Sequence, residues 1–161
     1  MMNAIDQAGI LAISTRLLRL SEQLRRDGLL IYKEHGIAFE PKWFPVIYTL
    51  HVKPLLSVVE IAGEIGYAHP STISLLKEME KEKLIQSKKD KTDERKRLVQ
   101  LTAKGRQLVG QMQPVWNIMV DAITELTDTQ NKLMQAIIEV EGQLKQQTFF
   151  QRAQRLSNKK Y

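Results

Sequence analysis

The chain has 161 residues, 43% of them hydrophobic and 26% charged, a composition typical of a folded globular protein. It contains no cysteine, which excludes disulfides, thiolate metal sites and cysteine nucleophiles. No stretch is apolar enough to span a bilayer, and no basic residue precedes Arg16, as a secretory signal would require. We therefore predict a cytoplasmic protein without a membrane partner.

The net charge of +6 is unevenly distributed along the chain. Residues 77–106 carry eleven basic and six acidic side chains, and residues 143–161 carry five basic and no acidic ones. Residues 107–142 have one basic and five acidic side chains. Such asymmetry indicates a polyanionic partner, with an ordinary solvated surface as the alternative.

The first forty residues favour long helices. Apolar residues at helical spacing predict one helix over residues 4–34, which Gly36 should end. Pro41 suits the first turn of a second helix that runs to about His51, before Pro54 interrupts the chain.

Two short helices separated by a glycine are predicted next. Ser57 and Glu60 form a capping-box pattern, so a helix should begin at Ser57 and end before Gly66. Pro70 then opens another helix that extends to about Lys83.

After this pair of helices the pattern changes from helix to strand. Residues 84–89 and 96–101 read as the two strands of a hairpin, with the charged loop 90–95 between them. Thr102 then caps a long helix in which Pro114 should produce a kink. A last helix should start at Thr127 or Thr129 and run through Leu144.

The predicted elements follow one another as helix, glycine turn, helix and charged hairpin. This order defines a winged helix-turn-helix, in which the second helix enters the major groove of DNA. At 100° per residue, Thr72, Ile73, Leu76 and Met79 share the inward side of that helix. The outward side is small and polar near the N-terminus and basic further along, as expected where a helix approaches base edges and phosphates. An ordinary surface helix is the alternative. The candidate DNA-binding residues are His69, Pro70, Ser71, Ser74, Lys77, Lys81, Lys88, Lys89, Lys91, Arg95 and Arg97.

Four runs of the sequence are informative together: LSVVEIA (56–62), HPSTISLLKEME (69–80), LI (84–85) and RLVQLTAKG (97–105). With these runs in this order, nearly the whole chain resembles the MarR-type winged-helix transcription regulators. The wing tip matches the family pattern at Asp90, Asp93 and Arg95 but has Thr92 where the family usually has arginine. Lys83 stands where the family usually has glycine, and because lysine would strain a left-handed turn, a different turn is predicted here.

The resemblance implies a single MarR-like domain over residues 1–161, mainly α-helical with a small β-hairpin wing (α+β). A DNA-binding lobe over about 41–105 would lie between long dimerisation helices at 1–36 and 107–161. The implied function is a homodimeric repressor of a pseudo-palindromic site on double-stranded DNA. Phe149, Phe150 and Leu156 would then be buried against the second subunit.

Many regulators of this type release DNA when a small apolar or aromatic ligand binds between the dimerisation helices and the lobe. The residues that would line such a pocket here are Tyr32, Phe39, Trp43, Phe44 and Tyr48. The alternative is that these aromatic side chains belong to the core.

No other chemistry is predicted. His35, His51 and His69 are isolated, without a second ligand at metal spacing, and no catalytic constellation is present, so we expect neither a metal, nor a cofactor, nor an enzyme. A winged-helix interaction module that does not bind DNA, such as an antirepressor or scaffold, remains the alternative function.

Overall fold

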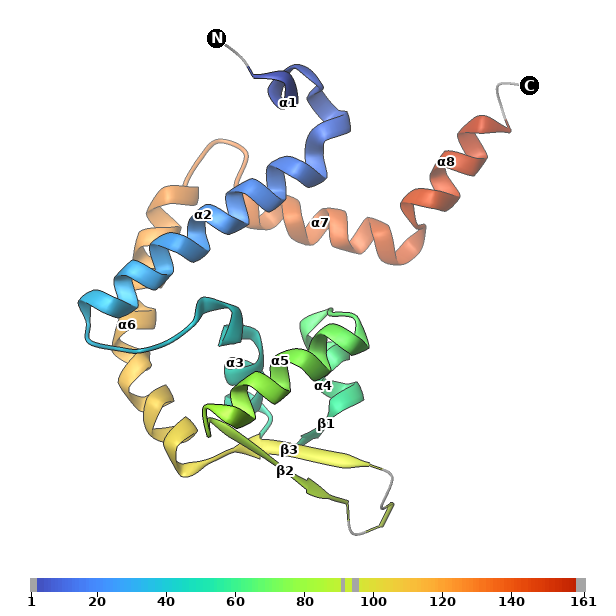
Figure 1. Cartoon of the computed structure of the whole chain (residues 1–161). Helices are drawn as coiled ribbons and strands as arrows, with labels where there is room; N and C mark the ends of the chain where they lie inside the picture. Colours follow the sequence, from blue (N-terminus) through green and yellow to red (C-terminus); the bar gives the residue numbers. More distant parts are fainter. Residues whose placement is uncertain (1–2, 91, 94–95, 159–161) are drawn as a thin grey trace. The chain divides into compact units, whose positions relative to one another are not determined.

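A computed structural model describes residues 3–90, 92–93 and 96–158 (Figure 1). It consists of two compact units, residues 1–116 and 117–161. The elements in chain order are α1 (Ala4–Gln7), η1 (Gly9–Ala12), α2 (Ile13–Glu34), η2 (Pro41–Trp43), α3 (Phe44–Val52), β1 (Leu56–Ser57), α4 (Val58–Ile65), α5 (His69–Lys81), β2 (Ile85–Lys89), β3 (Arg97–Leu101), α6 (Ala103–Thr127), α7 (Leu133–Gln146) and α8 (Phe149–Ser157). No helix in the described part of the chain is long and apolar enough to cross a membrane.

The predicted single helix over residues 4–34 is wrong at its beginning. Gly9 has φ +57°, a left-handed value that does not occur inside an α-helix, so the chain forms the short α1 and the 3₁₀ turn η1 before α2 starts. The predicted end is confirmed, because α2 stops at Glu34 and Gly36 has φ +70°.

The helix-turn-helix forms as its local signals predict. The Ser57 hydroxyl accepts the Glu60 N–H at 3.3 Å, and the Glu60 carboxylate accepts the Ser57 N–H at 2.7 Å, which completes the capping box of α4. Gly66 at φ +70° ends α4, and α5 follows at His69 with Pro70 in its first turn. Local chemistry therefore places α5 directly after the turn.

The wing is a three-stranded antiparallel sheet with strand order β1-β3-β2. β2 and β3 form the predicted hairpin, seen as the ribbon below α5 in Figure 1, with Ser87 opposite Val99. The prediction missed β1, which pairs Leu56 with Val99 and Ser57 with Leu98. Two residues are too few to show a strand period.

The core of the first unit joins α3, α4, α5, the wing and α6. Its fully buried side chains include Val46, Ile47, Ile61, Met79 and Met112. Helix α5 contributes a buried face to this core, and its one buried polar side chain, Thr72, donates to the Ala68 carbonyl at 3.2 Å. That bond satisfies the hydroxyl inside the core.

The turn between α5 and the wing keeps the left-handed conformation, contrary to the prediction of a different turn. Lys83 has φ +59°. The Thr102 hydroxyl donates to the Lys83 carbonyl at 2.6 Å and accepts the Gly105 N–H at 3.0 Å, so one side chain holds the turn and caps α6. These bonds hold Lys83 in the left-handed conformation, which lysine seldom adopts.

Helix α6 runs through Pro114 without interruption and ends at Thr127, in the second unit. Neither Thr127 nor Thr129 caps the following helix. The Thr127 hydroxyl bonds back to the Ile123 carbonyl at 2.7 Å, and α7 begins only after Lys132. The last predicted helix is therefore misplaced at its start.

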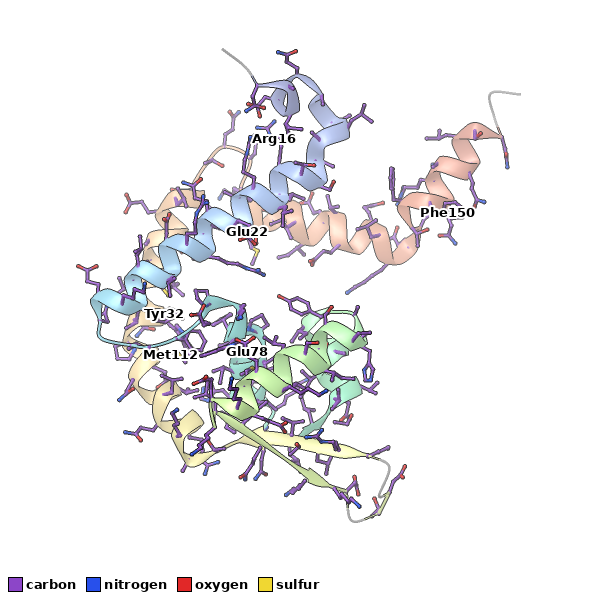
Figure 2. All side chains as sticks on the ribbon, in the orientation of Figure 1. Arg16, Glu22, Tyr32, Glu78, Met112 and Phe150 are labelled. Atoms are coloured by element: carbon purple, nitrogen blue, oxygen red, sulfur yellow. The ribbon has the colours of Figure 1, made fainter. Side chains whose placement is uncertain are left out.

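The additional helix α8 has its own capping box, made by Thr148 and Gln151. Arg152 donates to the Gln143 carbonyl of α7 at 3.0 Å and thereby ties the two helices together. Phe150 on α8 is exposed (Figure 2).

Candidate nucleic-acid interface

Helix α5 has one buried and one exposed face. Thr72, Leu75, Leu76 and Met79 are buried, whereas the exposed side chains are Ser71, Ser74, Lys77 and Lys81. The predicted division into an inward and an outward side is confirmed, except that Ile73 is only half-buried and Leu75 also points inward. The exposed face is the small, polar and basic surface that a helix needs to enter a major groove.

The N-terminal end of α5 is open. His69 and Pro70 are exposed, and no side chain caps the first turn. The partial positive charge at a helix N-terminus attracts phosphate groups, and Ser71 is short enough to allow their approach. This end of the helix can therefore lie close to a nucleic-acid backbone.

The wing adds basic side chains next to α5. Lys88 and Lys89 are exposed on β2, at the end nearer the wing tip. Two further predicted contacts, Lys91 and Arg95, lie outside the described residues.

The tip of the wing is organised by Asp90. Its carboxylate accepts the Thr92 hydroxyl at 2.6 Å, the Thr92 N–H at 2.7 Å and the Asp93 N–H at 3.4 Å. These bonds, chiefly that from the Thr92 side chain, hold the pKa of Asp90 below its usual value. Threonine at position 92 thus stabilises the turn at the wing tip.

Arg97, predicted to contact DNA, lies on the surface and is paired with side chains of the protein. Its guanidinium donates to Glu80 Oε1 on α5 at 3.0 Å, and its Nε donates to the Ser87 hydroxyl on β2 at 3.1 Å. Ser87 in turn donates to Glu80. Arg97 therefore links β3, β2 and α5, and the sequence alone contains no signal that these three residues meet.

A second contact missed by sequence reasoning joins α5 to the segment before α3. Glu78, which Figure 2 shows on α5, accepts the Trp43 indole N–H at 2.7 Å and the Lys42 ammonium at 2.8 Å. The hydrogen bond from Lys42, with a smaller contribution from Trp43, holds the pKa of Glu78 below its usual value. Glu78 faces η2 and is not on the free part of the α5 surface.

The structure divides the five aromatic residues of the predicted pocket into two groups. Tyr32, Phe39 and Trp43 are buried and form a chain of edge-on ring contacts, with centroids 4.9 Å and 5.8 Å apart. Phe44 and Tyr48 are exposed and stack at 5.4 Å.

Trp116 connects the two aromatic groups. Its ring lies edge-on to Phe44 at 5.6 Å and close to Tyr48 at 5.7 Å. Its N–H donates to the Tyr32 hydroxyl at 2.9 Å, and burial raises the pKa of that hydroxyl. We call Phe44, Tyr48, His51 and Trp116 the aromatic face.

The comparisons with known proteins give matches by structure only. No protein-family model and no curated protein matches the chain. The repressor CouR bound to a 23-mer DNA duplex matches with 24% identity and a TM-score of 0.64, over 84% of this chain and 95% of CouR. A MarR variant from E. coli complexed with operator DNA matches with 17% identity and a TM-score of 0.66, over 89% of this chain and 99% of the MarR chain.

NadR in complex with 4-hydroxyphenylacetate matches with 23% identity and a TM-score of 0.58, over 80% of this chain and 90% of NadR. All these identities are low, but the coverage of the solved chains is almost complete. Together with the order of helices and wing strands described above, the matches show that this chain has the winged helix-turn-helix fold of the MarR-type transcription regulators.

Proposed function

We propose that the protein is a homodimeric, sequence-specific regulator that binds double-stranded DNA in the cytoplasm and represses transcription from a pseudo-palindromic site. The observation that carries this proposal is the exposed face of α5, which is small and polar at its N-terminal end and basic at its C-terminal end. The DNA complexes of CouR and MarR, which share the fold, support it.

In this proposal the exposed residues divide into two roles. Ser71 and Ser74 contact base edges, because short side chains let α5 approach the floor of the major groove. Phosphates are bound by the exposed N-terminus of α5 at His69 and Pro70 and by the lysines of α5 and β2, namely Lys77, Lys81, Lys88 and Lys89.

The wing has its own part in the proposed complex. The tip residues Lys91 and Arg95 reach the neighbouring minor groove or backbone. Arg97, which is exposed and paired with Glu80, orients the wing against α5 and also contributes to phosphate binding.

The homodimer is supported by apolar side chains that remain exposed in each unit. In the first unit Ile10 and Leu11 on η1 are prominent, with Leu11 88% exposed. In the second unit Phe149 and Phe150 on α8 are exposed, Phe149 by 79%. Soluble monomers rarely expose so many neighbouring apolar residues, and a second copy of the chain would cover them.

We further propose that a small apolar or aromatic effector binds at the aromatic face and lowers the affinity for DNA. Phe44 and Tyr48 offer exposed rings, and the bond from Trp116 to Tyr32 leads from them into the core. NadR, which has the same fold, binds an aromatic acid. Such an effector must bind the free dimer more tightly than the DNA complex, by the factor by which it weakens DNA binding.

The salt dependence of DNA binding tests the function directly. Each neutralised phosphate contributes a slope of about −0.9 to log K against log salt, so a dimer that uses lysines on both half-sites should show a slope of at least roughly −5. Sites selected from random duplexes should contain two half-sites about one helical turn apart, near 34 Å. An affinity that barely changes with salt would favour the interaction module that does not bind DNA.

Two substitutions separate base reading from phosphate contact. Ser74→Gln should change the preferred sequence, whereas Lys88→Ala should weaken binding to all sequences alike. If the Ser74 variant selects the same sites with the same affinity, the assignment of the α5 reading face is wrong.

A further inference from the structure

A side chain of α2 reaches the turn of the helix-turn-helix. Arg25 Nη2 donates to the Tyr67 hydroxyl at 3.3 Å, although the two residues are 42 positions apart in the sequence. Arg25 lies on α2 and Tyr67 lies in the turn between α4 and α5, all within the first unit. We call this contact the orienting bond.

The backbone around Tyr67 is fixed on both sides. The Tyr67 N–H donates to the Ala62 carbonyl at 3.2 Å, and Gly66 before it holds the left-handed conformation that ends α4. Helix α5 begins at His69, two residues further on. The half-buried ring of Tyr67 has only two rotatable bonds. A displacement of its hydroxyl is therefore passed to the N-terminal end of α5, the end proposed to read bases.

The guanidinium of Arg25 is oriented by its own helix. Its Nη1 donates to Glu22 Oε1 at 3.5 Å, from the preceding turn of α2, where Figure 2 labels Glu22. Both side chains are exposed, so this ion pair adds little to the free energy of unfolding. Its effect is to direct the second nitrogen of Arg25 toward Tyr67.

Helix α2 is attached to the first unit at a second place as well. Its buried residues are Gly28 and Tyr32, and the Tyr32 hydroxyl accepts the Trp116 N–H at 2.9 Å. Tyr32 follows Arg25 by seven residues, which is about 10 Å along the helix axis at 1.5 Å per residue. Two attachments this far apart fix an angle, whereas the buried one alone would act as a pivot.

We propose that the orienting bond sets the angle between α2 and α5, which makes Arg25 and Tyr67 positioning residues for DNA recognition. The consequence for DNA rests on the proposed function, because in a homodimer this angle determines how far apart the two α5 helices lie. Half-sites one helical turn apart require a separation near 34 Å. The angle itself can be measured without DNA, so a failure of this inference and a failure of the proposed function are distinguishable.

Distances between two spin labels test the angle. The chain has no cysteine, so labels can be attached at Gln23→Cys on α2 and Gly63→Cys on α4. Both positions are exposed, and nothing lies within 4 Å of a Cβ atom at Gly63. Labelled chains are diluted with unlabelled ones, so that pulsed electron paramagnetic resonance records distances within one chain. Tyr67→Phe keeps the ring but removes the acceptor, and it should widen the distance distribution. An unchanged distribution would overturn the proposal.

The spacing of half-sites tests the consequence. The wild-type protein should prefer its selected site over the same site with one base pair inserted between the half-sites. Arg25→Gln and Tyr67→Phe should each lower this preference about threefold, the effect expected from one exposed hydrogen bond. Arg26→Gln removes the same charge from the next, equally exposed residue of α2 and is the matched control. It should weaken binding to both sites alike and keep the preference.

A double variant shows whether the two residues act through one bond. Arg25→Gln combined with Tyr67→Phe should lower the preference no further than either substitution alone. Losses that add, or the same loss in Arg26→Gln, would overturn the proposal. If the wild-type protein bound no DNA, the proposed function would fail, and the spin-label distances would still decide whether the orienting bond sets the angle.

Discussion

Gly105 is a position where one added methyl group should disturb the base of the wing. It lies in the first turn of α6, against the backbone of Leu84, where the wing begins. A Cβ atom on Gly105 would lie 2.1 Å from the Leu84 carbonyl oxygen and 3.3 Å from a methyl group of Leu101. The same carbonyl accepts the Thr102 N–H at 3.0 Å and the Thr102 hydroxyl at 3.2 Å. The methyl group therefore meets backbone that other bonds hold in place.

The cost of Gly105→Ala follows from this geometry. The Leu84 carbonyl and α6 must separate by more than about 1 Å to reach ordinary contact. Such overpacking costs about 1–3 kcal/mol, and loss of a hydrogen bond at the same carbonyl adds about 1 kcal/mol. We expect a decrease of about 2–4 kcal/mol in the free energy of unfolding, a large part of the total for a protein of this size.

Urea denaturation followed by circular dichroism measures this decrease, and Gly110→Ala in the same helix is the matched control. Nothing lies within 4 Å of a Cβ atom at Gly110, so alanine there should stabilise the helix by up to about 1 kcal/mol. Gly105→Ala should also weaken DNA binding, since the wing base would shift. If both variants were as stable as the wild type, or changed stability alike, the close approach of α6 to Leu84 would be refuted.

Three further measurements test other contacts. Lys83→Gly should stabilise the protein by about 1 kcal/mol, because glycine removes the strain at φ +59°. Lys77→Gly, at an exposed position inside α5, should destabilise it by about as much, and equal urea midpoints for the two variants would contradict this. The pKa of the Glu78 carboxyl lies below its ordinary value of 4.5. The bonds of the ionised Glu78 therefore contribute fully to the free energy of unfolding above pH 4.5, and this contribution is lost as the pH falls through the lower pKa of the folded state. Glu78→Gln should therefore flatten the decrease of the melting temperature below that pH, and an unchanged acid slope would exclude the contribution. Tyr32→Phe should cost about 1–3 kcal/mol in a urea titration, because the Trp116 N–H loses its acceptor, and a smaller loss would show that water replaces the hydroxyl.

The sequence by itself determined the elements whose signals are local. The capping box at Ser57, the left-handed glycine at Gly66 and the proline at position 70 define the helix-turn-helix, because each acts within a few residues of itself. The division of α5 into a buried and an exposed face followed from the 3.6-residue period alone. The order of helices and hairpin was then enough to predict the winged-helix fold.

Only the tertiary structure decided which charged side chains are paired within the protein. Arg97 and Glu80 are 17 residues apart and Trp43 and Glu78 are 35 apart, so neither pair has a local signal. Strand register and helix packing bring them together, and a sequence period does not contain that information. The left-handed turn at Lys83 combines both kinds of contact: the Leu84 N–H closes it locally on the Met79 carbonyl at 3.0 Å, and the Thr102 hydroxyl before α6 holds the Lys83 carbonyl at 2.6 Å. Together these bonds outweigh the preference of lysine for the right-handed region.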